Sequence, residues 1–258
     1  MRRRPTPAAA VAVTAVTLFT ASACLAGTPG QARDPLAAPV SSGPDTGAGS
    51  APGLTDAQTR AALINEADLG APWMPSEGAA TWRDGLLKAT TTASPDCQRL
   101  LEALYTEEPF GRPSGSRAVS ALDDGDDQAQ LRYQVAAHRP ADVDRALAWL
   151  RTLPSTCGQF LATTTSSGVE TVQVEELLLP AVGDARQGLR VTLTGESDMN
   201  GQSPVLTLEV AAVRVADEAI VLTDGALGSV PPDDSTRRAL ELGAQRLTQV
   251  RAQARTQA

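Results

Sequence analysis

The sequence has little of the chemistry that most enzyme and metal sites use. Its 258 residues include one histidine, three cysteines, three Trp, two Tyr and three Phe. Any Ser-His-Asp triad would have to use His138, yet no Gly-x-Ser-x-Gly turn is present to expose a nucleophile. One histidine and dispersed cysteines cannot build a standard zinc site. We therefore expect no enzyme activity, no cofactor and no metal.

Lysine is scarce too, and acidic residues outnumber the basic ones. Lysine occurs once, at Lys88, and the net charge is −8. An acidic surface repels phosphate backbones, so we expect no nucleic-acid partner. For the same reason a basic patch cannot hold this protein on anionic lipid.

The longest uncharged apolar run lies at the start of the chain, from Val11 to Cys24, and follows Arg2, Arg3 and Arg4. A basic head, a short apolar run and small residues before the break are typical of a secretory signal peptide. The run is too short to span a bilayer comfortably. We predict a signal peptide over residues 1–23 and export from the cytoplasm.

Cys24 suggests how the exported protein is held. Ala21-Ser22-Ala23-Cys24 resembles a bacterial lipobox, in which the cysteine is lipidated and becomes the mature N-terminus, although the usual leucine is replaced by Ala21. We predict a protein anchored to the cell membrane by lipid on Cys24 and facing the extracytoplasmic side. Ordinary cleavage after Ala23 is the alternative, and it would make the protein secreted.

Residues 24–53 form a linker and residues 54–258 a folded domain, in this interpretation. The linker is rich in Gly, Pro, Ala, Ser and Thr and cannot bury enough apolar area to fold. As a random coil it would span about 30 Å, which lifts the domain clear of a membrane.

Local signals predict four helices. The first begins at Thr55-Asp56 and stops at Gly70, and the second begins at Ser94-Pro95 and ends before Pro109. A third starts at Arg139-Pro140 and ends near Pro154, and a fourth follows Pro231-Pro232 to the C-terminus.

Alternating apolar residues predict the strands. A hairpin is expected from residues 117–122 and 130–137, and four further strands from residues 169–179, 188–194, 205–215 and 218–223. Another strand is predicted near residues 80–87, and residues 163–168 are predicted to form a loop. Strands joined by short turns indicate an α+β fold, an antiparallel β-sheet with helices packed on it.

Cys97 and Cys157 remain once Cys24 is lipidated. Two cysteines in an exported protein predict one disulfide, and the alternative is two free thiols. The bond would close a loop of roughly 60 residues, worth about 4 kcal/mol in the chain-entropy model.

The order of these features resembles the PknH-like extracellular sensor-domain family, over about residue 54 to the C-terminus. The matching motifs are Ala67-Asp68-Leu69-Gly70 followed by Trp73, Pro95-Asp96-Cys97 before Leu100-Leu101-Leu104, Tyr133, Arg145-Ala146-Leu147, Cys157, and Leu179-Pro180 with Gly183-Asp184 before Leu189-Arg190-Val191. The resemblance implies a two-layer α+β domain with a cleft for an undefined ligand. A second disulfide and a kinase domain, present in some members, are missing here, so signalling is not implied.

Three groups of residues are candidates for a site. Asp123, Asp124, Asp126 and Asp127 do not have EF-hand spacing, and a solvated turn is the favoured interpretation. Glu175 and Glu176 are neighbours on a strand and point to opposite faces. Trp73 lies between prolines and is a candidate for the rim of a ligand cleft, although packing is the simpler role. Gly183-Asp184 predicts a tight turn in which Asp184 accepts backbone hydrogen bonds.

Three functions remain open. The first is a membrane-anchored, non-catalytic domain that binds an unknown small ligand. The second is a structural or protein-interaction module of the cell envelope, which would show an exposed apolar patch. The third is a hydrolase with an unrecognised pair of carboxylates, one with a raised pKa, in a pocket.

Overall fold

The structure, a computed structural model, describes residues 53–78, 81–126, 128–165, 168–197, 201–232 and 234–257. The predicted signal peptide, Cys24 and nearly all of the predicted linker lie outside these residues. In the part described, no helix is long and apolar enough to cross a membrane.

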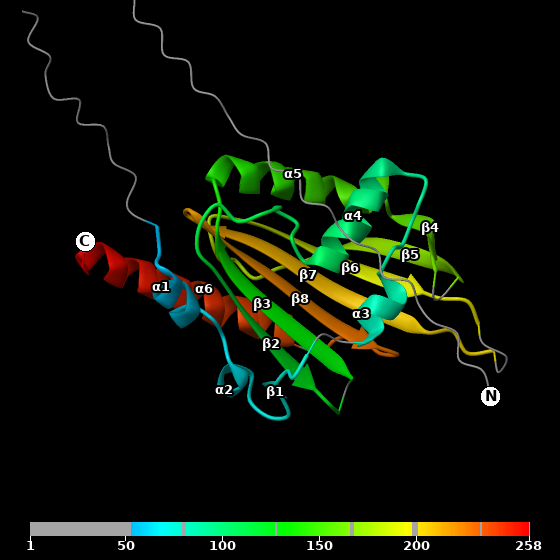
Figure 1. Cartoon of the computed structure of the whole chain (residues 1–258), viewed down its shortest axis with the longest axis horizontal. Helices are drawn as coiled ribbons and strands as arrows, with labels where there is room; N and C mark the ends of the chain where they lie inside the picture. Colours follow the sequence, from blue (N-terminus) through cyan, green and yellow to red (C-terminus); the bar gives the residue numbers. More distant parts are fainter. Residues whose placement is uncertain are drawn as a thin grey trace, which may run out of the picture. The chain divides into compact units, whose positions relative to one another are not determined.

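One antiparallel sheet of eight strands forms the centre of the domain (Figure 1). Its spatial order is β1-β2-β3-β8-β7-β6-β5-β4. The strands are β1 (Met74–Pro75), β2 (Arg117–Asp124), β3 (Ala129–Ala137), β4 (Gln159–Thr164), β5 (Gly168–Leu177), β6 (Ala185–Thr194), β7 (Val205–Val215) and β8 (Glu218–Leu227). The α+β prediction is confirmed, as is the hairpin of β2 with β3, and β7 and β8 form a second hairpin.

Helices cover both faces of the sheet. On one face lie α3 (Thr81–Leu86), α4 (Pro95–Thr106) and α5 (Pro140–Thr156), and on the other lie α1 (Asp56–Ala61), α2 (Glu66–Leu69) and α6 (Ser235–Gln257). The alternation of β7 produces both cores, since Leu206 and Leu208 pack towards α4 and α5 while Ala211 and Val213 pack towards α6. The domain therefore has three layers, where the family resemblance implied two.

The predicted strand near residues 80–87 is wrong, because this segment forms α3. Arg83, Leu86 and Leu87 have the i, i+3, i+4 spacing of one helical face. Leu86 and Leu87 are both buried in the core beside α4, and Arg83 Nε donates to the Tyr105 carbonyl at the end of α4 at 3.1 Å. A strand would have sent the two leucines to opposite faces.

Three boundaries also differ from the predictions. The first helix is broken into α1 and α2, because Ile64 inserts into the core and Asn65 caps a new start. The α5 helix continues past Pro154, since proline removes one hydrogen bond only and the Cys157 N–H still bonds to Leu153 at 2.7 Å. Residues 159–164 form β4, a strand that was not predicted from the sequence, and β4 includes residues 163 and 164 of the predicted loop.

The turn at Gly183 and Asp184 is confirmed. Gly183 has φ +66°, and a Cβ there would lie 2.4 Å from Val213. The Asp184 carboxylate accepts a hydrogen bond from the backbone N–H of Ala216 at 2.7 Å. This turn thereby ties the start of β6 to the turn after β7.

Candidate functional site

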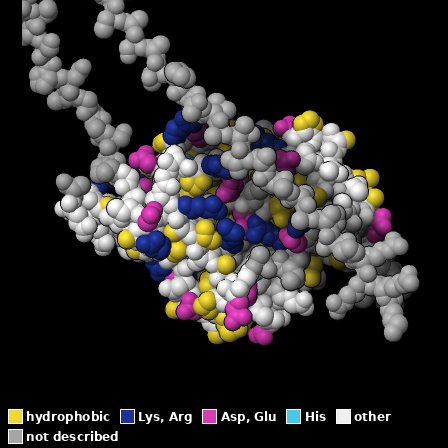
Figure 2. Space-filling view, in the orientation of Figure 1, with side chains coloured by type: hydrophobic (Ala, Val, Ile, Leu, Met, Phe, Trp, Pro, Cys, Tyr) yellow, Lys and Arg dark blue, Asp and Glu magenta, His cyan; other side chains and the backbone are white. Residues whose placement is uncertain are grey.

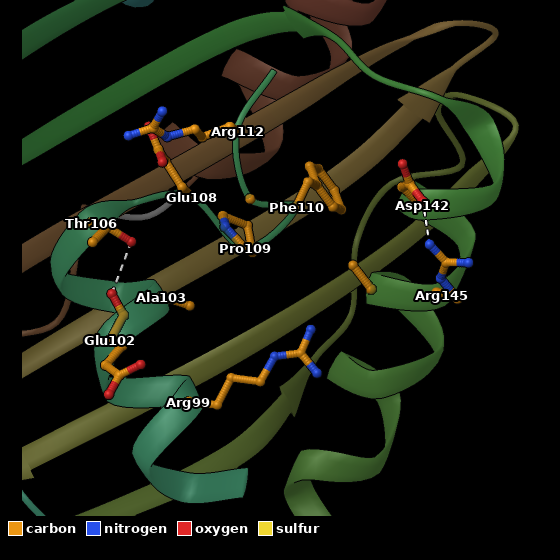
Figure 3. A pocket seen from close by; sticks show the side chains of 12 residues that line it. Arg99, Glu102, Ala103, Thr106, Glu108, Pro109, Phe110, Arg112, Asp142 and Arg145 are labelled. Carbon is orange, nitrogen blue, oxygen red and sulfur yellow. Dashed lines mark hydrogen bonds and ion pairs between the residues drawn. The ribbon is translucent and has the colours of Figure 1, made fainter. Parts of the chain in front are cut away.

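An open cleft of about 500 Å³ lies between α4 and α5 (Figure 3). The segment from Glu108 to Arg112, which leaves α4, closes one end of it. The lining residues are Arg99, Glu102, Ala103, Thr106, Glu108, Pro109, Phe110, Gly111, Arg112, Asp142, Arg145 and Ala146. Its volume falls in the range of small-molecule sites.

A disulfide holds the two helices beside each other. Cys97 in the first turn of α4 is bonded to Cys157 at the C-terminal cap of α5, with the two Cα atoms 5.6 Å apart. Both cysteines are buried. The predicted disulfide is confirmed, and it spans one end of the gap in which the cleft lies.

Arg99 reaches from α4 across the cleft towards α5 (Figure 3). Its Cζ lies 3.8 Å from the centroid of the Trp149 ring, which is cation–π contact. Trp149 is half-buried and packs against the core under α5. The indole therefore fixes one face of the guanidinium.

On the α5 side, Asp142 is held by two arginines. Arg139 Nε donates to its carboxylate at 2.6 Å, and Arg145 pairs with its other oxygen. The hydrogen bond from Arg139 lowers the pKa of Asp142, so this carboxylate is charged at neutral pH.

Ion pairs fix the segment that closes the cleft. Glu107, with φ +54°, ends α4 and pairs with Arg132 and with Arg83. The next residue, Glu108, pairs with Arg117 at 2.8 Å. Figure 2 shows Arg and Lys side chains gathered on this face with acidic side chains among them. The network joins the end of α4 to β2, β3 and α3.

Burial dominates the electrostatics of this network. It raises the pKa of Glu107, against the opposing effect of Arg132, and it lowers the pKa of Arg132. Loss of either partner would leave a buried charge uncompensated, which is strongly destabilising. We therefore assign these residues to holding the cleft wall.

His138 lies behind the wall. It is 4% exposed, and its ring meets the edge of Phe110 with centroids 5.6 Å apart. Burial lowers its pKa, which favours the neutral imidazole. His138 therefore packs in the core as a structural side chain.

Beneath the cleft the core is nearly filled. A narrow apolar space of about 10 Å³ shares Ala103 and Pro109 with the cleft wall and is otherwise lined mainly by core residues such as Leu104 and Leu150. Such a space holds at most one water molecule. A ligand would therefore occupy the outer cleft, among the arginines.

A second groove of about 470 Å³ lies by the end of β5 and the start of β6. Its lining includes Arg151, Glu176, Leu178 and Arg186. Leu178 is 88% exposed, so much of this groove is formed by side chains open to solvent. The cleft between α4 and α5 is the better defined of the two, because a disulfide and ion pairs hold its walls.

A buried carboxylate lies on the other side of the sheet. Asp224 has a pKa raised to about 7 by burial, with Glu209 and Asp124 adding to the shift. The hydroxyls of Ser235 and Thr236 in the first turn of α6 donate to it. Asp224 is fully buried, so this arrangement joins α6 to β8 and does not offer the accessible carboxylate pair that a hydrolase needs.

The other residues considered from sequence do not meet at the cleft. Trp73 is 8% exposed and packs in the core beneath α6, on the opposite face of the sheet. Among the described residues no group of three or more His, Cys, Asp and Glu side chains could hold a metal. Asp124 is buried and not part of a solvated turn, and Asp127 lies outside the described residues.

Sequence reasoning missed Arg99, Phe110 and Arg145 as cleft residues. Arg99 and its neighbour Trp149 are far apart along the chain, and each alone is an ordinary helical residue. The predicted bond between Cys97 and Cys157 was the one signal available, because it brings α4 beside α5.

No family model and no curated protein matches the chain. Among solved structures, the extracellular domain of PknH from Mycobacterium tuberculosis matches 79% of this chain and 100% of that chain, with 16% identity and a TM-score of 0.45. The chain is similar to this PknH domain. The Rv0999 ortholog of Mycobacterium smegmatis matches 70% of this chain and 90% of its own, with 16% identity and a TM-score of 0.33. At this identity the similarity does not extend to ligand or activity.

Proposed function

We propose that this protein is an exported, lipid-anchored binding protein whose folded domain takes up a small molecule without transforming it. The observation that carries the proposal is the cleft of about 500 Å³ between two helices tied by a disulfide. Walls that are held in place before a ligand arrives lower the entropic cost of binding. The disulfide also suits the oxidising compartment that the signal segment predicts.

Binding in the cleft is tested with a matched pair of variants. Ala103 lines the cleft on α4, and Ala103→Phe would fill the cleft. Ala252 is exposed on α6, and Ala252→Phe adds the same side chain outside the cleft. A chemically mixed fragment set is screened against the three proteins by ligand-observed NMR. We expect hits on wild type and Ala252→Phe that are lost on Ala103→Phe, and hits that persist in Ala103→Phe would contradict the cleft.

The anchor has a separate test. The intact mass of protein purified from its own membranes should include a diacylglyceryl group on Cys24, and reduction should add about two hydrogens for one disulfide. A lipid-free species that begins at or after Cys24 would instead show secretion. That result would leave the binding function in place, because the cleft lies wholly within the folded domain.

A protein-interaction role is the second candidate. Leu161 on β4 and Val169 on β5 are diagonal neighbours on one face of the sheet, 64% and 42% exposed. Two side chains make a small patch, so we rank this role below ligand binding. Light scattering of wild type and Leu161→Ser tests this role. If wild type self-associates or forms a complex and Leu161→Ser does not, protein interaction would rank above ligand binding.

A further inference from the structure

The cleft contains a positive charge that the protein does not neutralise. Among the described residues, the Arg99 guanidinium forms no ion pair, and its observed contact is with the face of Trp149. Stacking on an indole uses the face of the guanidinium and leaves the N–H groups at its edge available. Those donors lie in the open cleft (Figure 3).

The acidic residues of the cleft are mostly occupied elsewhere. Asp142 is paired with both Arg139 and Arg145, and Glu108 is paired with Arg117. These ion pairs neutralise the negative charges of Asp142 on α5 and of Glu108 on the closing segment.

Glu102 is the remaining acid of the cleft, and it accepts a hydrogen bond from the Gln98 amide at 3.1 Å. Arg112 on the closing segment has no ion pair in the part of the chain that the structure describes. The lining itself has three arginines and three acids, so its positive excess comes from Arg117 and Arg139, which pair with Glu108 and Asp142 from outside the lining. Arg99 and Arg112 then face Glu102 alone, although the chain as a whole carries −8.

The rest of the lining is apolar apart from Thr106, whose hydroxyl donates to the Glu102 carbonyl at 2.9 Å. Ala103 lines the gap from α4, and Pro109 and Phe110 line it from the connecting segment (Figure 3). Ala146 lines it from α5. A ligand that meets both surfaces needs a flat or compact apolar body and one anionic group.

We propose that the cleft binds a small organic anion, whose carboxylate or phosphate is held by Arg99 and whose apolar body packs on Phe110 and Pro109. Arginine suits both anions because its N–H groups match two oxygens at once. The proposal rests on the cleft being the binding site and adds the chemical class of the ligand. Trp149 acts as a positioning residue, since it orients Arg99 without needing to touch the ligand.

Three naphthalene compounds test the class of ligand. Naphthalene carboxylate, its neutral carboxamide and naphthyl phosphate share the apolar body and differ in the polar group. Each is titrated into the purified full chain by calorimetry. We expect saturable binding of the better anion that is about tenfold or more tighter than that of the carboxamide, because charge-assisted hydrogen bonds exceed neutral ones. The tighter of the two anions identifies the group that the cleft prefers.

Arg99→Gln should weaken anion binding about tenfold, to the level of the carboxamide, and Arg99→Lys should fall between. Arg60→Gln is the matched control, because Arg60 is an exposed arginine on α1 at the opposite face of the sheet. It removes the same charge and should leave the affinity unchanged. Melting temperatures of all variants show whether each is folded.

Several outcomes would overturn the proposal. Equal affinity for the carboxamide and the anions, or unchanged anion binding in folded Arg99→Gln, would show that the cleft does not select charge. If Arg60→Gln weakened anion binding as much as Arg99→Gln does, the anion would be attracted by the charge of the whole protein and not held at a site in the cleft. Absence of binding by all three compounds would also reject the class, while the fragment screen on Ala103→Phe decides separately whether the cleft binds ligands.

Discussion

Gly243 of α6 provides the sharpest test of how closely the helix packs on the sheet. A Cβ at this position would lie 2.1 Å from the hydroxyl oxygen and 2.5 Å from Cζ of Tyr133 on β3. Tyr133 is fully buried, and both elements belong to the core on the α6 side. Gly243→Ala therefore forces the helix or the ring to move.

The expected effect follows from two opposing contributions. Alanine is favoured over glycine inside a helix by about 1 kcal/mol. Overpacking of a tight core costs about 1–3 kcal/mol and occasionally more. Because 2.1 Å is far inside van der Waals contact, the upper end applies, and we expect Gly243→Ala to lower the free energy of unfolding by about 2 kcal/mol. Urea denaturation followed by far-ultraviolet circular dichroism measures this.

Two further variants identify the contact. Gly85 in α3 has no atom within 4 Å of its added Cβ, so Gly85→Ala should gain stability from helix propensity alone. Within the described residues the Tyr133 hydroxyl has no hydrogen-bond partner, so Tyr133→Phe should leave the protein at least as stable as wild type. Combined with Gly243→Ala it should restore part of the loss. If Gly243→Ala raised the free energy of unfolding as much as Gly85→Ala does, the close approach of α6 to β3 would be refuted.

Three more predictions concern buried groups and the turn. Because burial raises the pKa of Asp224 to about 7, its contribution to the free energy of unfolding should be greatest below pH 4 and should fall by about 4 kcal/mol as the pH rises through 7. Asp224→Asn should flatten this dependence of the free energy of unfolding on pH. Replacing Cys97 and Cys157 by serine should lower the free energy of unfolding by about 4 kcal/mol, measured in urea, and a loss below about 1 kcal/mol would contradict it. Gly183→Ala, which meets Val213 in a left-handed conformation, should lower the melting temperature, and an unchanged value would place the turn elsewhere.

Local signals in the sequence located most elements because capping and periodicity act over a few residues. Ser94-Pro95 predicted the start of α4, and the alternating pattern predicted β3 and β7. The elements that were predicted wrongly are those in which tertiary contacts outweigh the local sequence pattern. The segment that ends in Leu86 is helical because Leu86 and the following Leu87 both pack in one core. The first helix is broken at Ile64 because burial of Ile64 outweighs one more helical turn.

The candidate site was much harder to predict. His138 and Glu175 could be weighed from sequence, because a triad or a carboxylate pair has known residue types and spacings. A cleft that uses Arg99 on one helix and Phe110 on a following segment has no such motif. The feature that marks this cleft is a guanidinium without an acidic partner, and which side chains are paired is decided by how they pack in the folded protein.

By itself, the sequence determined the α+β class, the types of most elements and the pairing of Cys97 with Cys157, because each depends on short-range patterns or on a choice between few cysteines. The predicted signal segment is likewise local. Only the tertiary structure decided that β3 pairs with β8 and that helices cover both faces of the sheet. It also placed Arg99 over Trp149 to leave an open cleft. These features join residues far apart along the chain, 50 positions for Arg99 with Trp149 and 81 to 97 for β3 with β8. The packing of the whole core governs such contacts, so they leave no local pattern.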